Sequence, residues 1–166
     1  FWVGQLGSTE LAAMSFTFPV TFVVLSVAMG IGIGTTSVIA RAIGQGEEEE
    51  VKRLTTHGLM LANLVVVVFA LAGITTIDPV FRLIGADESL VPLIHEYMFP
   101  WYLGVGFLVI PMVGNSAIRA TGDTKTPSLI MVIAGGVNMV LDPMLIFGVG
   151  PFPRLELEGA ALATVI

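Results

Sequence analysis

Long apolar runs separated by short polar stretches make up most of this chain. Crossing the roughly 30 Å hydrocarbon core of a bilayer takes about 20 helical residues, and four of the runs are long enough. A fifth run begins near the carboxyl end. We therefore predict transmembrane helices over about residues 11–41, 54–77, 90–118 and 127–148, with the start of another at 159–166.

The polar stretches are predicted to be loops, because glycine, proline and charged residues cluster in them. Residues 41–53 contain two glycines followed by the acidic run Glu47–Glu50, which we interpret only as a solvated surface. Residues 78–89 are broken by Pro79 and Gly85. Two further loops are expected at 119–126 and 148–158.

Composition indicates the same class of protein. Of the residues, 55% are hydrophobic and only 12% are charged, whereas soluble domains carry about 25% charged residues. We therefore predict an all-α integral membrane protein, a polytopic helical bundle. The chain has no cysteine, which excludes disulfides and thiolate metal sites. Its seven basic residues are spread out and form no surface for nucleic acid.

Charged and aromatic residues predict how the spans sit in the membrane. Five basic residues flank the first-to-second and third-to-fourth connections, and two flank the opposite side, so the first group is expected in the cytoplasm. Tyr97 and Trp101, early in the third span, fit an aromatic belt at a membrane–water boundary. The basic residues are Arg41, Lys52, Arg53, Arg119 and Lys125 on one side, and Arg82 and Arg154 on the other.

One span carries candidate chemistry. The apolar run from Pro127 to Phe147 contains a single ionisable residue, Asp142, and a carboxamide four positions earlier, Asn138. Positions i and i+4 share a helix face, so the two oxygen-bearing side chains form a polar stripe. A carboxylate at membrane depth is costly unless it is neutralised, paired or hydrated, so other spans should enclose Asp142. The pair is suited to hold a proton or Na⁺.

Structural interpretations of these residues stay open at this point. Asp142 precedes Pro143 and could cap a helical segment after a break, and Asn138 could form only an interhelical hydrogen bond. For Asn115 and Tyr97, which also lie within spans, the residues alone favour a structural role. An enzyme is not expected, because the chain has no Ser–His–acid grouping in one region, no HExxH motif and no phosphate-binding loop.

Four stretches occur in a characteristic order. They are Ile-Ala-Arg-Ala-Ile-Gly-Gln-Gly at 39–46, Asn-Ser-Ala-Ile-Arg-Ala-Thr-Gly-Asp-Thr-Lys-Thr-Pro at 115–127, the Asn138–Asp142–Pro143 segment, and Gly-Ala-Ala-Leu-Ala-Thr at 159–164. In this order they resemble the multidrug and toxic compound extrusion (MATE) family of efflux antiporters. The match covers nearly the whole chain, which makes it specific.

The resemblance implies twelve helices in two six-helix lobes around a central cavity. The chain would be an incomplete N-terminal lobe without the first helix and the C-terminal lobe, and those helices and the lipid bilayer are its expected partners. The family's cation- or proton-binding cluster maps onto Asn138, Asp142 and Asn115, with Thr164 the loosest match and Tyr97 a further contact. The family's first-helix Asp has no counterpart here. Counted from the cytoplasmic ends, Asn115 lies about two turns shallower than Asn138, a difference that a bend at Pro111 or a helix extending past Arg119 could absorb.

The resemblance further implies a secondary active multidrug exporter in the plasma membrane. It would expel cationic or amphiphilic organic compounds by antiport with Na⁺ or H⁺ and would need no other cofactor. Ion binding at Asp142 is expected to change how the helices pack, which produces alternating access. One alternative is a lipid-linked-oligosaccharide flippase of the same wider superfamily, which should bring more cationic residues into its cavity. Another is a membrane scaffold whose polar stripe only joins helices.

Overall fold

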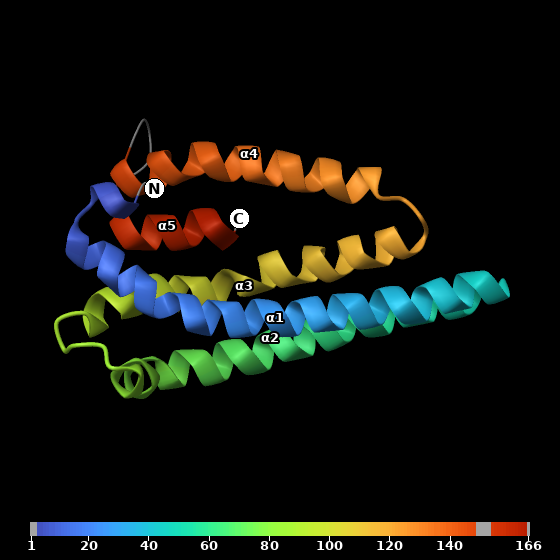
Figure 1. Ribbon diagram of the computed structural model, residues 1–166, viewed down its shortest axis with the longest axis horizontal. Helices are drawn as coiled ribbons and strands as arrows, with labels where there is room; N and C mark the ends of the chain where they lie inside the picture. Colours follow the sequence, from blue (N-terminus) through green and yellow to red (C-terminus); the bar gives the residue numbers. More distant parts are fainter. Residues whose placement is uncertain (1–2, 149–153, 166) are drawn as a thin grey trace.

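The structure is a computed structural model and describes residues 3–148 and 154–165. Within these ranges, five α-helices lie along one long axis after a short 3-10 turn, and there is no strand (Figure 1). Each helix runs antiparallel to the one before it. The elements are η1 (Val3–Gln5), α1 (Ser8–Gln45), α2 (Glu48–Ile84), α3 (Val91–Ala120), α4 (Lys125–Phe147) and α5 (Glu156–Val165).

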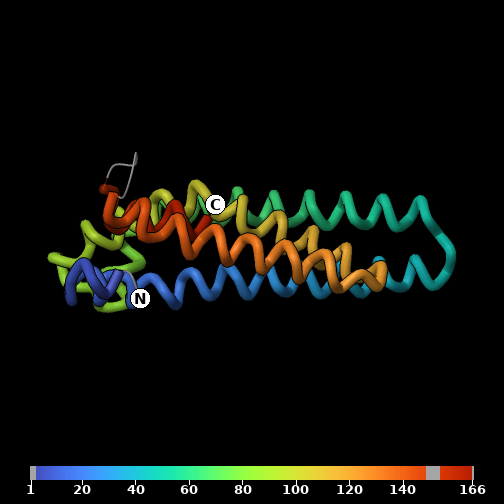
Figure 2. Tube along the Cα trace, turned by 90° about the horizontal axis from the view of Figure 1, so that it is seen from above, coloured from blue at the N-terminus to red at the C-terminus, as the bar shows by residue number. Residues whose placement is uncertain are grey.

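Four of these helices, α1 to α4, are long and apolar enough to cross a membrane. The predicted all-α helical bundle is thus confirmed. At 38 and 37 residues, α1 and α2 are much longer than the roughly 20 residues that a bilayer needs. Their hairpin therefore extends past the ends of α3 and α4, as the two views at right angles show (Figures 1 and 2).

The loop predicted at 41–53 is wrong, because only Gly46 and Glu47 separate α1 from α2. Gly46 ends α1 with a φ of 74°, a left-handed conformation that glycine adopts without steric cost. The acidic run provides the first turn of α2, where the helix dipole favours negative charge. Two ion pairs of 2.7 Å between successive turns support this start: Lys52 with Glu49 and Arg53 with Glu50.

The helix is longer than the second predicted span, which ends at Ile77, because α2 continues through Pro79 to Ile84. A proline removes one helical hydrogen bond. The side chains of Ile77 and Phe81 on either side of it are fully buried, so tertiary packing holds the helix together across that gap. The helix ends where Gly85 takes a φ of 98°.

α3 is the centre of the bundle and packs against α1, α2 and α5. Small residues allow close approach on two sides: a Cβ at Gly73 of α2 would clash with the ring of Tyr102, and one at Gly32 of α1 would meet the hydroxyl of Ser116. The Thr36 hydroxyl donates a hydrogen bond of 2.9 Å to the Ser116 carbonyl oxygen and so joins α1 to α3.

The aromatic belt predicted at Tyr97 and Trp101 is not formed by these residues. Their side chains are only 5% and 2% exposed and belong to the core of the bundle. An aromatic ring near a helix end suits the membrane boundary and the helix interface equally well. Which of the two it faces depends on how neighbouring helices pack around α3.

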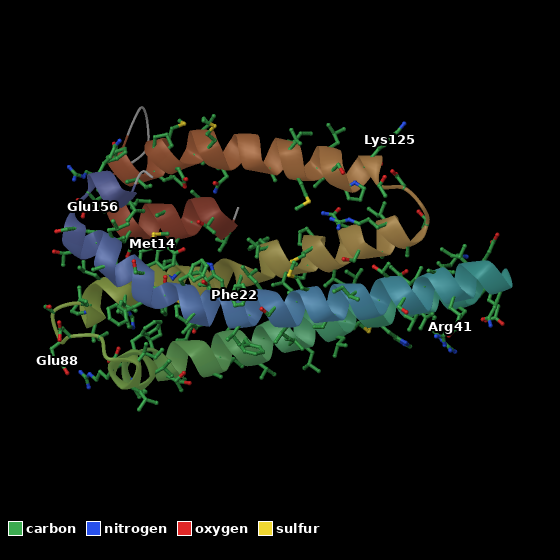
Figure 3. The ribbon with its side chains drawn as sticks, viewed as in Figure 1. Met14, Phe22, Arg41, Glu88, Lys125 and Glu156 are labelled. Atoms are coloured by element: carbon green, nitrogen blue, oxygen red, sulfur yellow. The ribbon has the colours of Figure 1, made fainter. Side chains whose placement is uncertain are left out.

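α4 lies apart from the other long helices. It packs on α5 and has only slight contact with α3, and most of its residues are exposed. α5 lies between α4 and α3 at one end of the bundle (Figure 1). Arg41 and Lys125 mark the opposite end, which the distribution of basic residues predicts to be cytoplasmic (Figure 3). α5 lies at the other end, which is predicted to face outward.

Candidate functional site

Asn138 and Asp142 lie one turn apart on the side of α4 that meets α5. The Asn138 side-chain nitrogen Nδ2 donates a hydrogen bond of 2.6 Å to the carbonyl oxygen of Ala163. Both Asn138 and Asp142 are partly buried on a helix whose middle is otherwise exposed. The carboxylate is therefore turned toward the other helices within this part of the protein, as the cost of exposing it to lipid requires.

Tyr97 of α3 and Thr164 of α5 extend this arrangement. The side chain of Tyr97 is hydrogen-bonded to that of Thr164 and interacts electrostatically with Asp142. The Thr164 hydroxyl also donates a hydrogen bond of 2.8 Å to the Ala160 carbonyl oxygen of its own helix. Three helices thus contribute to one polar cluster, which consists of Tyr97, Asn138, Asp142 and Thr164.

Pro143 shapes the turn of α4 that carries Asp142. Proline has no N–H, so the carbonyl oxygen of Met139 loses the helical hydrogen bond that residue 143 would otherwise donate. α4 nevertheless continues to Phe147, so Asp142 lies inside a helix and does not cap a new one.

The cluster offers oxygen atoms of several kinds. With its nitrogen bound to Ala163, the Asn138 side chain keeps its oxygen Oδ1 without a hydrogen bond in the described part of the chain. The Asp142 carboxylate and the Met139 carbonyl lie on neighbouring turns. Hard cations prefer carboxylate and carbonyl oxygens, and a carboxylate can instead take up a proton. The sequence analysis did not include the Met139 carbonyl among the candidate ligands. Pro143, four residues later, indicates that this oxygen lacks its helical hydrogen bond.

Asn115 does not join the polar cluster. The stretch of α3 from Tyr97 to Asn115 spans about 27 Å. The end of α5 reaches α3 at Gly104, where a Cβ would clash with Val165, and Asn115 is about 16 Å further along. α3 ends at Ala120, so the helix extends only one residue past Arg119. Antiparallel packing puts the end of α3 beside the start of α4, far from the second half of α4.

Comparison with known proteins finds relatives that are named as transporters. Residues 1–144 match the MatE family. The chain is 47% identical over 165 residues to the FAD transporter of Shewanella oneidensis, covering 99% of this chain and 36% of that protein. It is 36% identical to the solved inward-facing and outward-facing conformations of a multidrug resistance MATE family transporter of the MOP superfamily.

Both solved structures superpose closely on the chain. The TM-score is 0.91 for the inward-facing and 0.89 for the outward-facing conformation, and each match covers 99% of this chain and 36% of the other. The chain thus spans about a third of the length of the relatives it matches.

Proposed function

The chain belongs to the MatE family, and we propose that the whole protein is a cation-coupled exporter of small organic molecules whose ion site includes the polar cluster. MATE transporters are multi-pass proteins of the plasma membrane and are not enzymes, and this chain supplies four spans and part of a lobe. The observation that carries the proposal is the polar cluster itself: Asn138 of α4 is hydrogen-bonded to Ala163 of α5, next to Thr164, and Tyr97 of α3 interacts with Thr164 and Asp142.

The coupling follows from the charge of one side chain. An ionised Asp142 within the membrane is costly, and binding of H⁺ or Na⁺ removes most of that cost. An ion shifts a conformational equilibrium only as far as it binds one state better than the other. Asp142 meets this condition if the polar cluster faces water in one state and the remaining helices in the other.

We propose that the helices of this chain move together as one unit during alternating access. The expectation from sequence was that ion binding changes helix packing within the lobe. The close superposition on both an inward-facing and an outward-facing relative favours a different step, in which these helices keep their arrangement and move together against the rest of the protein.

The substitution Asp142→Asn tests the proposal in the whole protein. It removes the titratable charge while keeping the size of the side chain, so folding should persist and ion-driven export should fall to background. Export of a fluorescent organic cation from loaded vesicles, under separately imposed Na⁺ and pH gradients, measures this. Asp78→Asn is the matched control, because Asp78 is an exposed helical carboxylate of α2. Wild-type export by the Asp142→Asn protein would refute the ion site.

A second candidate concerns the substrate. Cationic or amphiphilic compounds were expected from sequence, whereas the relative that is 47% identical is named an FAD transporter. The multidrug structures are 36% identical. We therefore propose a flavin dinucleotide as a candidate substrate beside organic cations. Vesicles loaded with FAD or with an organic cation separate the two: gradient-driven FAD export that requires Asp142 supports the dinucleotide, and export of cations alone rejects it.

A further inference from the structure

A hollow of about 390 Å³ opens between α1 and α3 in the cytoplasmic half of the bundle. We propose that this hollow is a binding subsite for a phosphate ester, supplied either by an exported dinucleotide or by the headgroup of an anionic lipid. It is separate from the polar cluster, which lies at the outward end. Its lining consists of Ile33, Thr36 and Ser37 from α1 and Ser116 and Arg119 from α3.

Arg119 supplies the positive charge. No ion pair in the described part of the chain involves it, and its one side-chain hydrogen bond there runs from Nη2 to the sulfur of Met131 on α4, at 3.6 Å. Sulfur is a weak acceptor, so the guanidinium keeps its hydrogen-bonding capacity for a ligand. Asp123, the acid nearest in sequence, already accepts hydrogen bonds from Lys125 and Thr126. A planar guanidinium fits phosphate oxygens better than any other side chain.

The hydroxyl groups of the hollow add donors. Ser37 is exposed and makes no hydrogen bond within the described residues, so its proton is free for a ligand. The Ser116 hydroxyl donates to the Met112 carbonyl at 3.0 Å. The Met112 carbonyl is also part of the backbone hydrogen bonding of α3, so it does not depend on the Ser116 hydroxyl. The hydroxyl can therefore rotate toward a charged phosphate oxygen, which is the stronger acceptor. The Thr36 hydroxyl instead holds α1 to α3 and keeps the two walls in place.

The position of the hollow fits both sources of phosphate. An exported molecule loads from the cytoplasm, and anionic lipids are concentrated in the cytoplasmic leaflet, where basic pockets between helices bind their headgroups. The dinucleotide source depends on the proposed export function. The lipid source does not.

Equilibrium binding to the purified whole protein tests the subsite without any ion gradient. In nanodiscs of phosphatidylcholine, Arg119→Gln should weaken FAD binding by roughly ten-fold or more, since one charge-assisted contact is lost. Binding of riboflavin, the same ring system without phosphate, should not change. Arg41→Gln is the matched control: Arg41 is also exposed, unpaired and at the cytoplasmic end, but does not line the hollow. Ser37→Ala should reduce FAD affinity less, in the same direction.

A second arm separates the two sources. Nanodiscs of mixed phosphatidylglycerol and phosphatidylcholine are analysed for lipid that stays bound to the protein on detergent extraction. If the headgroup is the ligand, Arg119→Gln lowers bound phosphatidylglycerol and leaves FAD affinity unchanged. Equal effects of Arg119→Gln and Arg41→Gln in both arms would overturn the subsite, as would equal losses of FAD and riboflavin. If the Asp142→Asn protein exports without an ion gradient while Arg119→Gln still weakens FAD binding, the proposed ion-coupled export is wrong and the subsite stands.

Discussion

Asn138 and Asp142 share a helix face but have different tasks. Asn138 uses its nitrogen to hold α4 to α5. Asp142 has no hydrogen bond or ion pair in the described part of the chain, although it is partly buried. An acid that no helix contact depends on can change its charge without unfolding its surroundings. This property is what a coupling residue requires, and a purely structural carboxylate would not have it.

Asp123, which lies outside the spans, differs from Asp142 because hydrogen bonds hold its carboxylate in place. Its Oδ2 accepts a hydrogen bond from the Thr126 hydroxyl at 2.5 Å, and its Oδ1 accepts from the N–H groups of Lys125 and Thr126 at 3.0 Å. These bonds, the Thr126 hydroxyl first, lower the pKa of Asp123 below its usual value. Since the folded pKa is depressed, the stabilisation is present above the unfolded pKa and is lost as pH falls through the folded pKa.

We predict that Thr126→Val raises the pKa of Asp123 toward its usual value, because the strongest hydrogen bond to the carboxylate is lost. Titration of the side-chain carboxyl carbon by NMR in detergent micelles measures the midpoint. Thr124→Val is the control, because the Thr124 side chain makes no hydrogen bond to Asp123. An unchanged midpoint in the Thr126 variant would mean that the hydroxyl does not hold the carboxylate.

At the scale of the elements, α5 decides where α4 lies. α4 has little contact with α3, so the short α5 forms most of its attachment to the bundle. The two helices approach closely at Gly159, where a Cβ would lie 2.5 Å from the Leu145 carbonyl oxygen. The Leu155 N–H also donates to that oxygen, at 3.0 Å, and closes the connection. The polar cluster exists only while this contact persists.

We predict that Gly159→Ala destabilises the protein by about 1–3 kcal/mol, the usual cost of overpacking, because backbone atoms of α4 cannot rotate away from the added methyl group. Thermal unfolding followed by tryptophan fluorescence measures this in detergent. Gly114→Ala is the matched control: it also places alanine in a helix, but no atom lies within 4 Å of the new Cβ. Equal melting temperatures for the two variants would show that α4 and α5 do not meet this closely.

At the scale of the whole molecule, the two ends of the bundle differ in chemistry. The end predicted to face outward holds the polar cluster, with one carboxylate, and the end predicted to be cytoplasmic holds the hollow with Arg119, together with Arg41 and Lys125. An exporter would use the cytoplasmic end for loading and the outward end for ion exchange. The helices that join the two sites superpose closely on relatives that face either way.

We predict that this arrangement persists during transport. Spin labels at the exposed residues Leu64 of α2 and Leu129 of α4 should report the same distance distribution with and without the coupling ion. A second pair, from Leu129 to the other lobe of the whole protein, should report a change. Double electron–electron resonance in nanodiscs measures both pairs. A shift between Leu64 and Leu129 as large as the one across the lobes would contradict movement as a unit.

Much of this protein could be predicted from local patterns. Apolar runs of this length are stable only in lipid, so the spans and the all-α class follow from the sequence. The shared face of Asn138 and Asp142 follows from the helical period alone. The ends of the helices were less accurately predicted, because Pro79 does not end α2 and the acidic run begins a helix.

The contacts between helices were decided only by the tertiary structure. It determined that Ala163 binds Asn138, that Tyr97 and Trp101 are buried, and that Asn115 lies far from the polar cluster. Helices that are apolar on every side carry no pattern that says which face meets which neighbour. Only the packing of segments far apart in the chain specifies this, through close approach at residues such as Gly73 and Gly159.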